Sequence, residues 1–124
     1  MLHPVNIHWF EIPVADIDRA QRFYEGILAV ALRRESFEGR EMAEFPHDEA
    51  IHATGALVAG AGCTPSAEGS TIYLSVADVA RVLEAATLQG AEILVPRTVL
   101  PADIGAIAQF RDSEGNRIGL WSRH

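Results

Sequence analysis

The residues of this chain that could do metal chemistry are a few histidines and acids in its first half. His8 lies in a run of strand-forming residues, and His47, Asp48, Glu49 and His52 share one short stretch. Imidazole and carboxylate groups are common ligands of transition metals. The spacing within the second cluster fixes no ligand geometry, so we interpret it as a solvated loop and His8 as a structural histidine.

Glu11 is the strongest candidate for acid–base chemistry. It alternates with Trp9 in a strand-like run, so both side chains are expected on one face of that strand. A carboxylate on an apolar wall suits a general base, because burial raises its pKa. The alternative is an ion pair, for example with Arg111 or Arg117. Cys63 has no histidine motif beside it, which argues against covalent catalysis.

An internal repeat indicates which elements position these residues. The segment 14–20 (VADIDRA) recurs as 76–82 (VADVARV), and the aspartates are 78 − 16 = 62 residues apart, half of the 124-residue chain. Each copy follows an apolar strand-like run and begins a helical pattern. A repeat at this spacing predicts two similar modules, with function most readily placed in the groove between them.

Each module is expected to have the order strand, helix and three strands. Asp16 and Asp78 are helix N-caps, and Gly90 is placed to end the second helix. Module 1 covers about 5–59, with strands over 5–14, 30–37, 40–45 and 54–59. A turn-rich linker covers 60–70, and module 2 covers about 71–124, with strands over 71–76, from 93, 104–111 and 117–121. The two modules together are expected to make one domain over residues 1–124.

Composition restricts the class of protein. The chain is 48% hydrophobic with a net charge of −7 and no cluster of Lys and Arg, which argues against nucleic-acid binding. No apolar run approaches the roughly 20 residues that span a membrane. The start of the sequence lacks the pattern of a secretory signal, and its single cysteine allows no intrachain disulfide. We therefore expect a cytoplasmic protein without membrane or nucleic-acid partners.

The motifs at both ends of the repeat resemble the vicinal-oxygen-chelate superfamily, which includes glyoxalase I, bleomycin-resistance proteins and extradiol dioxygenases. They are the segment 10–16 (FEIPVAD), the pairs Arg19-Ala20 and Phe23-Tyr24, the segment 76–79 (VADV), and the closing segment 110–120 (FRDSEGNRIGL). The resemblance implies an α+β fold of two tandem βαβββ modules. Their curled mixed sheets would form a central cup, with one helix per module outside. It also implies a divalent ion in that cup, acting as a Lewis acid.

The positions that hold metal ligands in the superfamily carry other residues here. The first ligand precedes the capping aspartate by seven residues, which gives Trp9 and Thr71. The closing position is Gly119, and subtraction of the repeat offset (119 − 62 = 57) gives Leu57. Indole, leucine and glycine offer a hard cation no side-chain oxygen, and threonine alone is a poor ligand. We therefore expect no metal and no cofactor at the usual place.

Strand alternation gives the expected lining of the cup. Aromatic and apolar side chains with few polar groups are typical of a small-molecule pocket, although they could equally fill the concave face as core. The expected ligand-pocket residues are Trp9, Glu11, Leu57, Thr71, Tyr73, Gly119 and Trp121.

Three functions follow from these patterns. The first is a metal-free member of the superfamily that binds a small organic ligand, with Glu11 as the candidate catalytic residue if it is an enzyme. The second is a divalent-metal lyase, isomerase or dioxygenase with shifted ligands from His8, His47, His52 or Glu11. The third is a non-enzymatic dimerising module with filled cups. By analogy with relatives that pair modules across subunits, we expect a homodimer.

Overall fold

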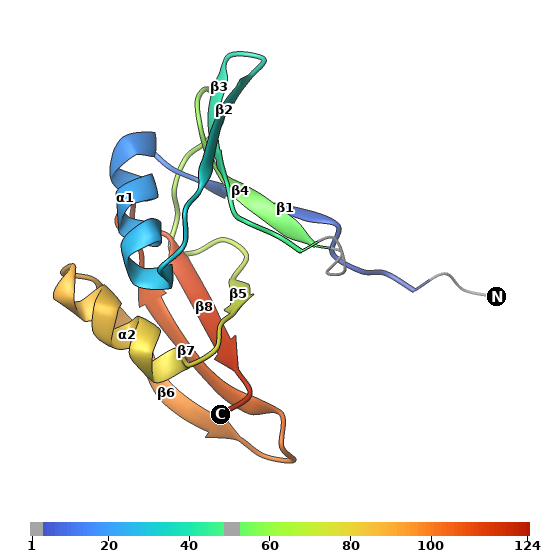
Figure 1. The fold of residues 1–124 in the computed structure, drawn as a ribbon, viewed down its shortest axis with the longest axis vertical. Helices are drawn as coiled ribbons and strands as arrows, with labels where there is room; N and C mark the ends of the chain where they lie inside the picture. The colour runs from blue at the N-terminus through green and yellow to red at the C-terminus, as the bar shows by residue number, and fades with distance from the viewer. Residues whose placement is uncertain (1–3, 49–52) are drawn as a thin grey trace.

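The structure, a computed structural model, describes residues 4–48 and 53–124 and consists of two βαβββ modules (Figure 1). Module 1 contains β1 (Trp9–Pro13), α1 (Ile17–Leu28), β2 (Arg33–Phe37), β3 (Arg40–Glu44) and β4 (Thr54–Ala59). Module 2 contains β5 (Ile72–Ser75), α2 (Val79–Leu88), β6 (Glu92–Leu100), β7 (Gly105–Arg111) and β8 (Arg117–Ser122). The predicted element order and the α+β class are confirmed.

Each module forms its own four-stranded mixed sheet. Sheet A has the order β1-β4-β3-β2 and sheet B the order β5-β8-β7-β6, with the first pair parallel and the others antiparallel. The helices α1 and α2 contact each other and lie side by side, with sheet A above and sheet B below in Figure 1. We call the face of each sheet that is turned away from the helices its outer face.

The predicted helix boundaries follow from local chemistry. The Asp16 carboxylate accepts a hydrogen bond from the Arg19 N–H, and the Asp78 carboxylate accepts from the N–H groups of Ala80 and Arg81. These bonds satisfy amides that lack a partner in the first helical turn. Gly90, at φ 85°, follows α2 as predicted, because glycine adopts this left-handed conformation without strain.

Two strands begin several residues later than the sequence pattern predicts. β1 begins at Trp9 rather than at residue 5, and its first ladder partner is Thr54 at the start of β4. β2 begins at Arg33, which pairs with the last residue of β3, Glu44. Apolar alternation alone extends a predicted strand beyond the point where its partner strand ends.

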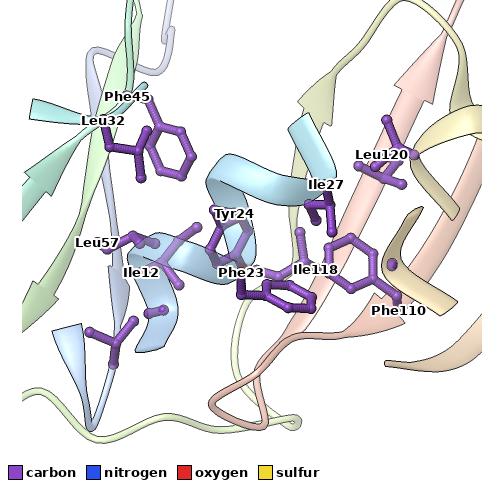
Figure 2. Close-up of a cluster of buried hydrophobic side chains, with 14 of the residues drawn as sticks. Ile12, Phe23, Tyr24, Ile27, Leu32, Phe45, Leu57, Phe110, Ile118 and Leu120 are labelled. Atoms are coloured by element: carbon purple, nitrogen blue, oxygen red, sulfur yellow. The ribbon is translucent and has the colours of Figure 1, made fainter. Parts of the chain in front are cut away.

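The core lies between the two sheets and the helices and is shared by both modules (Figure 2). Phe23 and Tyr24 of α1 meet edge to face, with ring centroids 5.3 Å apart. Phe23 also packs against Phe110 of β7 at 6.0 Å, which joins module 1 to sheet B. Neither of the helices in the described part of the chain is long and apolar enough to cross a membrane.

Candidate functional site

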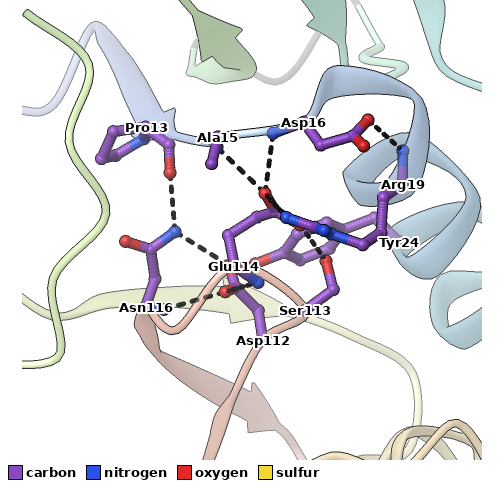
Figure 3. A network of polar contacts seen from close by, with 9 residues as sticks. All are labelled: Pro13, Ala15, Asp16, Arg19, Tyr24, Asp112, Ser113, Glu114 and Asn116. Atoms are coloured by element: carbon purple, nitrogen blue, oxygen red, sulfur yellow. Dashed lines mark hydrogen bonds and ion pairs between the residues drawn. The ribbon is translucent and has the colours of Figure 1, made fainter.

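The turn 112–116 between β7 and β8 joins module 2 to the start of α1 (Figure 3). Glu114 Oε1 accepts hydrogen bonds from the backbone N–H groups of Ala15 and Asp16, each at 2.9 Å. Its Oε2 accepts from the Arg19 Nε at 2.7 Å. A carboxylate from the second module thus lies at the positive N-terminus of the first module's helix, which is a favourable position for negative charge.

The side chain of Glu114 is fully buried and strongly acidic. Burial by itself raises the pKa of a carboxyl group. Here the hydrogen bonds from Arg19, the Asp16 N–H, Ser113 and the Ala15 N–H outweigh it and lower the pKa of Glu114 to about 2. The group is therefore a fixed anion at neutral pH, and its hydrogen bonds are committed to the joint between the modules.

Asp112 and Asn116 complete this joint. The buried Tyr24 hydroxyl donates to Asp112 Oδ2 at 2.6 Å, and Asn116 Nδ2 donates to the Pro13 carbonyl at 2.8 Å. Burial, together with the Asp112 carboxylate, raises the pKa of Tyr24 well above its ordinary value. The closing motif of the sequence therefore has a structural role, which the sequence pattern did not reveal because its partners lie about 90 to 100 residues away.

The outer face of sheet A carries Trp9 and Glu11, as strand alternation predicts. Trp9 is 37% exposed, whereas Phe10 and Ile12 pack into the core. The Trp9 Nε1 donates to Glu11 Oε2 at 3.2 Å, and the Arg40 guanidinium lies 3.9 Å from Glu11 Oε1.

The surroundings of Glu11 differ from the apolar wall expected for a general base. Its side chain is 44% exposed. Of the two interpretations drawn from the sequence, the geometry matches an ion pair, but the partner is Arg40 of β3. Arg111 instead pairs with Glu92, and Arg117 bonds elsewhere on sheet B.

The prediction that Leu57 lines the cup is wrong. Leu57 pairs with Ile12 in the parallel ladder, and both are buried in the core. The pairing of Glu11 with Ala56 matches that of Tyr73 with Gly119, so the offset between the last strands is 119 − 56 = 63 rather than 62. One extra residue before β8 shifts the register, and a shift of one residue reverses the face.

The outer face of sheet B carries Tyr73, Gly119 and Trp121. Tyr73 pairs with Gly119, and its ring covers the glycine so closely that a Cβ there would lie 2.5 Å from Tyr73 Cδ2. Trp121 lies over Gly105 in the same way, and its Nε1 donates to the Ile104 carbonyl at 2.9 Å. Both aromatic rings therefore lie in close contact with a glycine.

The residues that were expected around one cup line two different shallow cavities. Tyr73 and Trp121 line a hollow of about 410 Å³, together with Ser75, Leu100 and Ile107. We call it the sheet B hollow. Glu11 instead lines a cleft of about 250 Å³ at the seam of the modules, beneath the linker. Glu11 and the pair Tyr73 and Trp121 therefore line different cavities.

A third cavity, of about 450 Å³, lies where module 1 meets module 2. It is lined by apolar side chains of both modules, including Phe10, Leu28, Phe45 and Leu74.

Gln109 is a site residue that sequence reasoning missed. It lies on β7 opposite Gly119, on the side away from Tyr73. Its Nε2 lies 2.7 Å from the Tyr73 hydroxyl, and its Oε1 lies 2.7 Å from Arg117 Nη1. An amide in the middle of a strand gives no sequence signal, although its alternation with Phe110 could have placed it on the outer face.

The positions implied for a metal do not form a suitable donor set. They are Trp9, Ala56, Thr71 and Gly119, and only the threonine offers a side-chain oxygen. The glycine position is also covered by the Tyr73 ring.

The candidate metal-ligating histidines lie at the surface where the structure describes them. His8 and His47 are both exposed, while Glu49 and His52 lie outside the described residues. Among residues 4–48 and 53–124, no group of three or more His, Cys, Asp or Glu side chains is arranged to hold a metal ion. Thr71 is half-buried immediately before β5.

Comparison with solved structures places the fold among known proteins. Glyoxalase I from Zea mays superposes with a TM-score of 0.70 at 25% identity, over 94% of this chain and 45% of that chain. This chain therefore spans about half of the maize protein. TnmS3, an antibiotic binding protein from Streptomyces sp. CB03234, superposes with a TM-score of 0.70 at 21% identity, over 98% of both chains.

A glyoxylase/bleomycin resistance protein/dioxygenase domain from Frankia sp. EAN1pec gives a TM-score of 0.69 at 20% identity, again over 98% of both chains. At such low identities, the last two likenesses concern the fold alone. No curated protein sequence matches the chain. The family model described as Glyoxalase/Bleomycin resistance protein/Dioxygenase superfamily matches residues 6–120. The chain therefore belongs to the glyoxalase/bleomycin resistance protein/dioxygenase superfamily.

Proposed function

We propose that this protein binds a small, largely apolar organic ligand against the outer face of sheet B, without a divalent metal ion. The observation that carries the proposal is the composition of the sheet B hollow. Its walls are the rings of Tyr73 and Trp121 and the aliphatic side chains of Leu100 and Ile107. Apolar walls with a few polar groups are typical of ligand sites, and the hollow has a volume of about 410 Å³.

The covered glycine supports binding without a metal. An acidic side chain at position 119 would occupy the space in which the Tyr73 ring lies. The chain therefore has an aromatic contact surface where a metal-dependent relative would need a ligand. This favours a metal-free binder over a metal-dependent lyase, isomerase or dioxygenase, and Glu11 lines a different cavity.

A homodimer would complete the site. Large apolar side chains on the outer faces remain solvent-exposed in the single chain, among them Trp9 and Tyr73. Exposed apolar surface of this kind is often covered by a partner. A second copy placed against the hollow would enclose it, and the resemblance to relatives that pair modules across subunits supports this arrangement. Light scattering should give twice the chain mass, and a monomer would count against it.

Ligand screening with and without EDTA tests the proposal. A panel of flat organic compounds should contain members that raise the melting temperature. The substitution Ile107→Lys places a long charged side chain in the hollow and should abolish these shifts. The matched control Leu88→Lys lies at the end of the helix α2, which packs on the opposite face of sheet B, and should retain them. Shifts that vanish with EDTA but survive Ile107→Lys would contradict the proposal.

A further inference from the structure

The polar groups on the outer face of sheet B form a hydrogen-bonded chain with a fixed direction. Tyr73, Gly119 and Gln109 form one row across β5, β8 and β7. Because Gly119 has no side chain, Tyr73 and Gln109 meet above it, with the Gln109 Nε2 2.7 Å from the tyrosine hydroxyl. On the other side, Gln109 Oε1 lies 2.7 Å from Arg117 Nη1.

The direction follows from the chemistry of arginine. A guanidinium group only donates hydrogen bonds, so the oxygen of the Gln109 amide must face Arg117. The amide nitrogen must then face Tyr73 and donate to its oxygen. Arg117 is held in place by a second bond, from its Nε to the Ala67 carbonyl in the linker at 3.2 Å. The tyrosine oxygen therefore accepts within the chain, and its own proton is directed away from Gln109.

The surroundings of Tyr73 indicate which hydrogen-bond acceptors its hydroxyl proton can reach. Tyr73 is 43% exposed and lines the sheet B hollow. The indole N–H of Trp121 is already bonded to the Ile104 carbonyl, so the tryptophan offers the hollow only an apolar surface. Tyr73 and Ser75 are the residues lining this hollow that carry a side-chain hydroxyl.

We propose that Tyr73, positioned by Gln109 and Arg117, donates a hydrogen bond to the carbonyl oxygen of a flat, uncharged ligand held against Trp121 and Ile107. The inference rests on the proposed function and names the ligand class for that site. A hydroxyl whose oxygen accepts from a polarised amide is a better donor, because hydrogen bonds in a chain strengthen one another. The arrangement selects for a carbonyl group and offers an anionic ligand no cation of its own.

Two tricyclic probes that differ at one position test this inference. 9-Fluorenone carries a carbonyl group where fluorene carries a methylene group, and both are flat and apolar. In equilibrium dialysis, the unmodified protein should bind fluorenone roughly 10-fold more tightly than fluorene, as expected for one hydrogen bond with a polarised donor. The infrared carbonyl stretch of bound fluorenone should move to lower frequency.

Two conservative variants separate the donor from the residue that positions it. Tyr73→Phe keeps the ring over Gly119 and should remove both the preference for fluorenone over fluorene and the frequency shift. Gln109→Glu replaces a donor amide with an acceptor, so the tyrosine proton should turn toward it and the preference should also disappear. Melting curves verify that both variants are folded.

The outcomes separate this inference from the proposed function. Equal binding of fluorene and fluorenone by the unmodified protein would overturn the role of Tyr73 and leave the hollow as a binding site. A preference for fluorenone that survives Tyr73→Phe would overturn it as well. Binding of neither probe up to its solubility limit would overturn the inference and count against the proposed function.

Discussion

Replacing Glu114 with glutamine tests the joint between the modules. The carboxylate accepts from Arg19, from Ser113 and from two backbone amides at the start of α1. Glutamine keeps one oxygen but presents an NH₂ group where Oε2 accepts from Arg19 and Ser113, so donors would face donors. We therefore expect Glu114→Gln to destabilise the protein while leaving the residues of the sheet B hollow unchanged.

The magnitude follows from the pKa of Glu114. It falls from 4.5 to about 2 in the folded protein. This difference corresponds to about 3 kcal/mol of stability at neutral pH. Because the folded pKa is depressed, the contribution is fully present above about pH 4.5 and is lost as the pH falls toward 2. By linkage, about 2 kcal/mol of it should be gone near pH 3.

Urea unfolding of both proteins between about pH 3 and pH 7 measures this contribution. The free-energy difference between unmodified protein and Glu114→Gln should be about 3 kcal/mol at neutral pH and about 1 kcal/mol near pH 3. Glu84→Gln, which removes the same charge from an exposed site on α2, is the matched control and should change stability by less than about 0.5 kcal/mol. A Glu114→Gln difference that stays constant across this range would refute the reasoning.

Three further substitutions test separate parts of the structure. Tyr24→Phe removes a buried donor to Asp112 and should cost about 1.5–3 kcal/mol in urea unfolding, without altering ligand binding. Leu57→Ala leaves a core cavity and should cost about 2–5 kcal/mol, whereas a cup-facing leucine would cost much less. Gly119→Ala introduces a Cβ 2.5 Å from the Tyr73 ring. The ring must then move away from Gln109, so fluorenone should lose its advantage over fluorene in dialysis.

Much of the fold could be predicted from the sequence, because its signals are local. The residue type and spacing of Asp16 and Asp78 predict the starts of the two helices, and both residues cap their helices as expected. The length of β1 could not be predicted, since a strand extends only as far as the ladder partner that begins at Thr54. The role of Glu114 depends on contacts with Ala15 and Asp16, almost a chain length away, which no local pattern encodes.

The candidate site was predictable only in part. Alternation placed Trp9, Glu11, Tyr73 and Trp121 on the outer faces correctly, because the side-chain period of a strand is two. It failed for Leu57, because a constant repeat offset ignores one residue inserted before β8. The ion pair of Glu11 with Arg40 depends on how the β2–β3 hairpin sits against β4, which is a property of the assembled sheet.

The central claim is that the outer face of sheet B binds a flat organic ligand without a metal ion. A crystal structure of the protein soaked with both zinc chloride and fluorenone, recorded at the zinc absorption edge, tests it most directly. We predict fluorenone density against Trp121 with its carbonyl toward Tyr73, and no anomalous peak beside Trp9, Ala56, Thr71 or Gly119. A zinc peak at those positions, with the probe bound to the ion, would contradict the account.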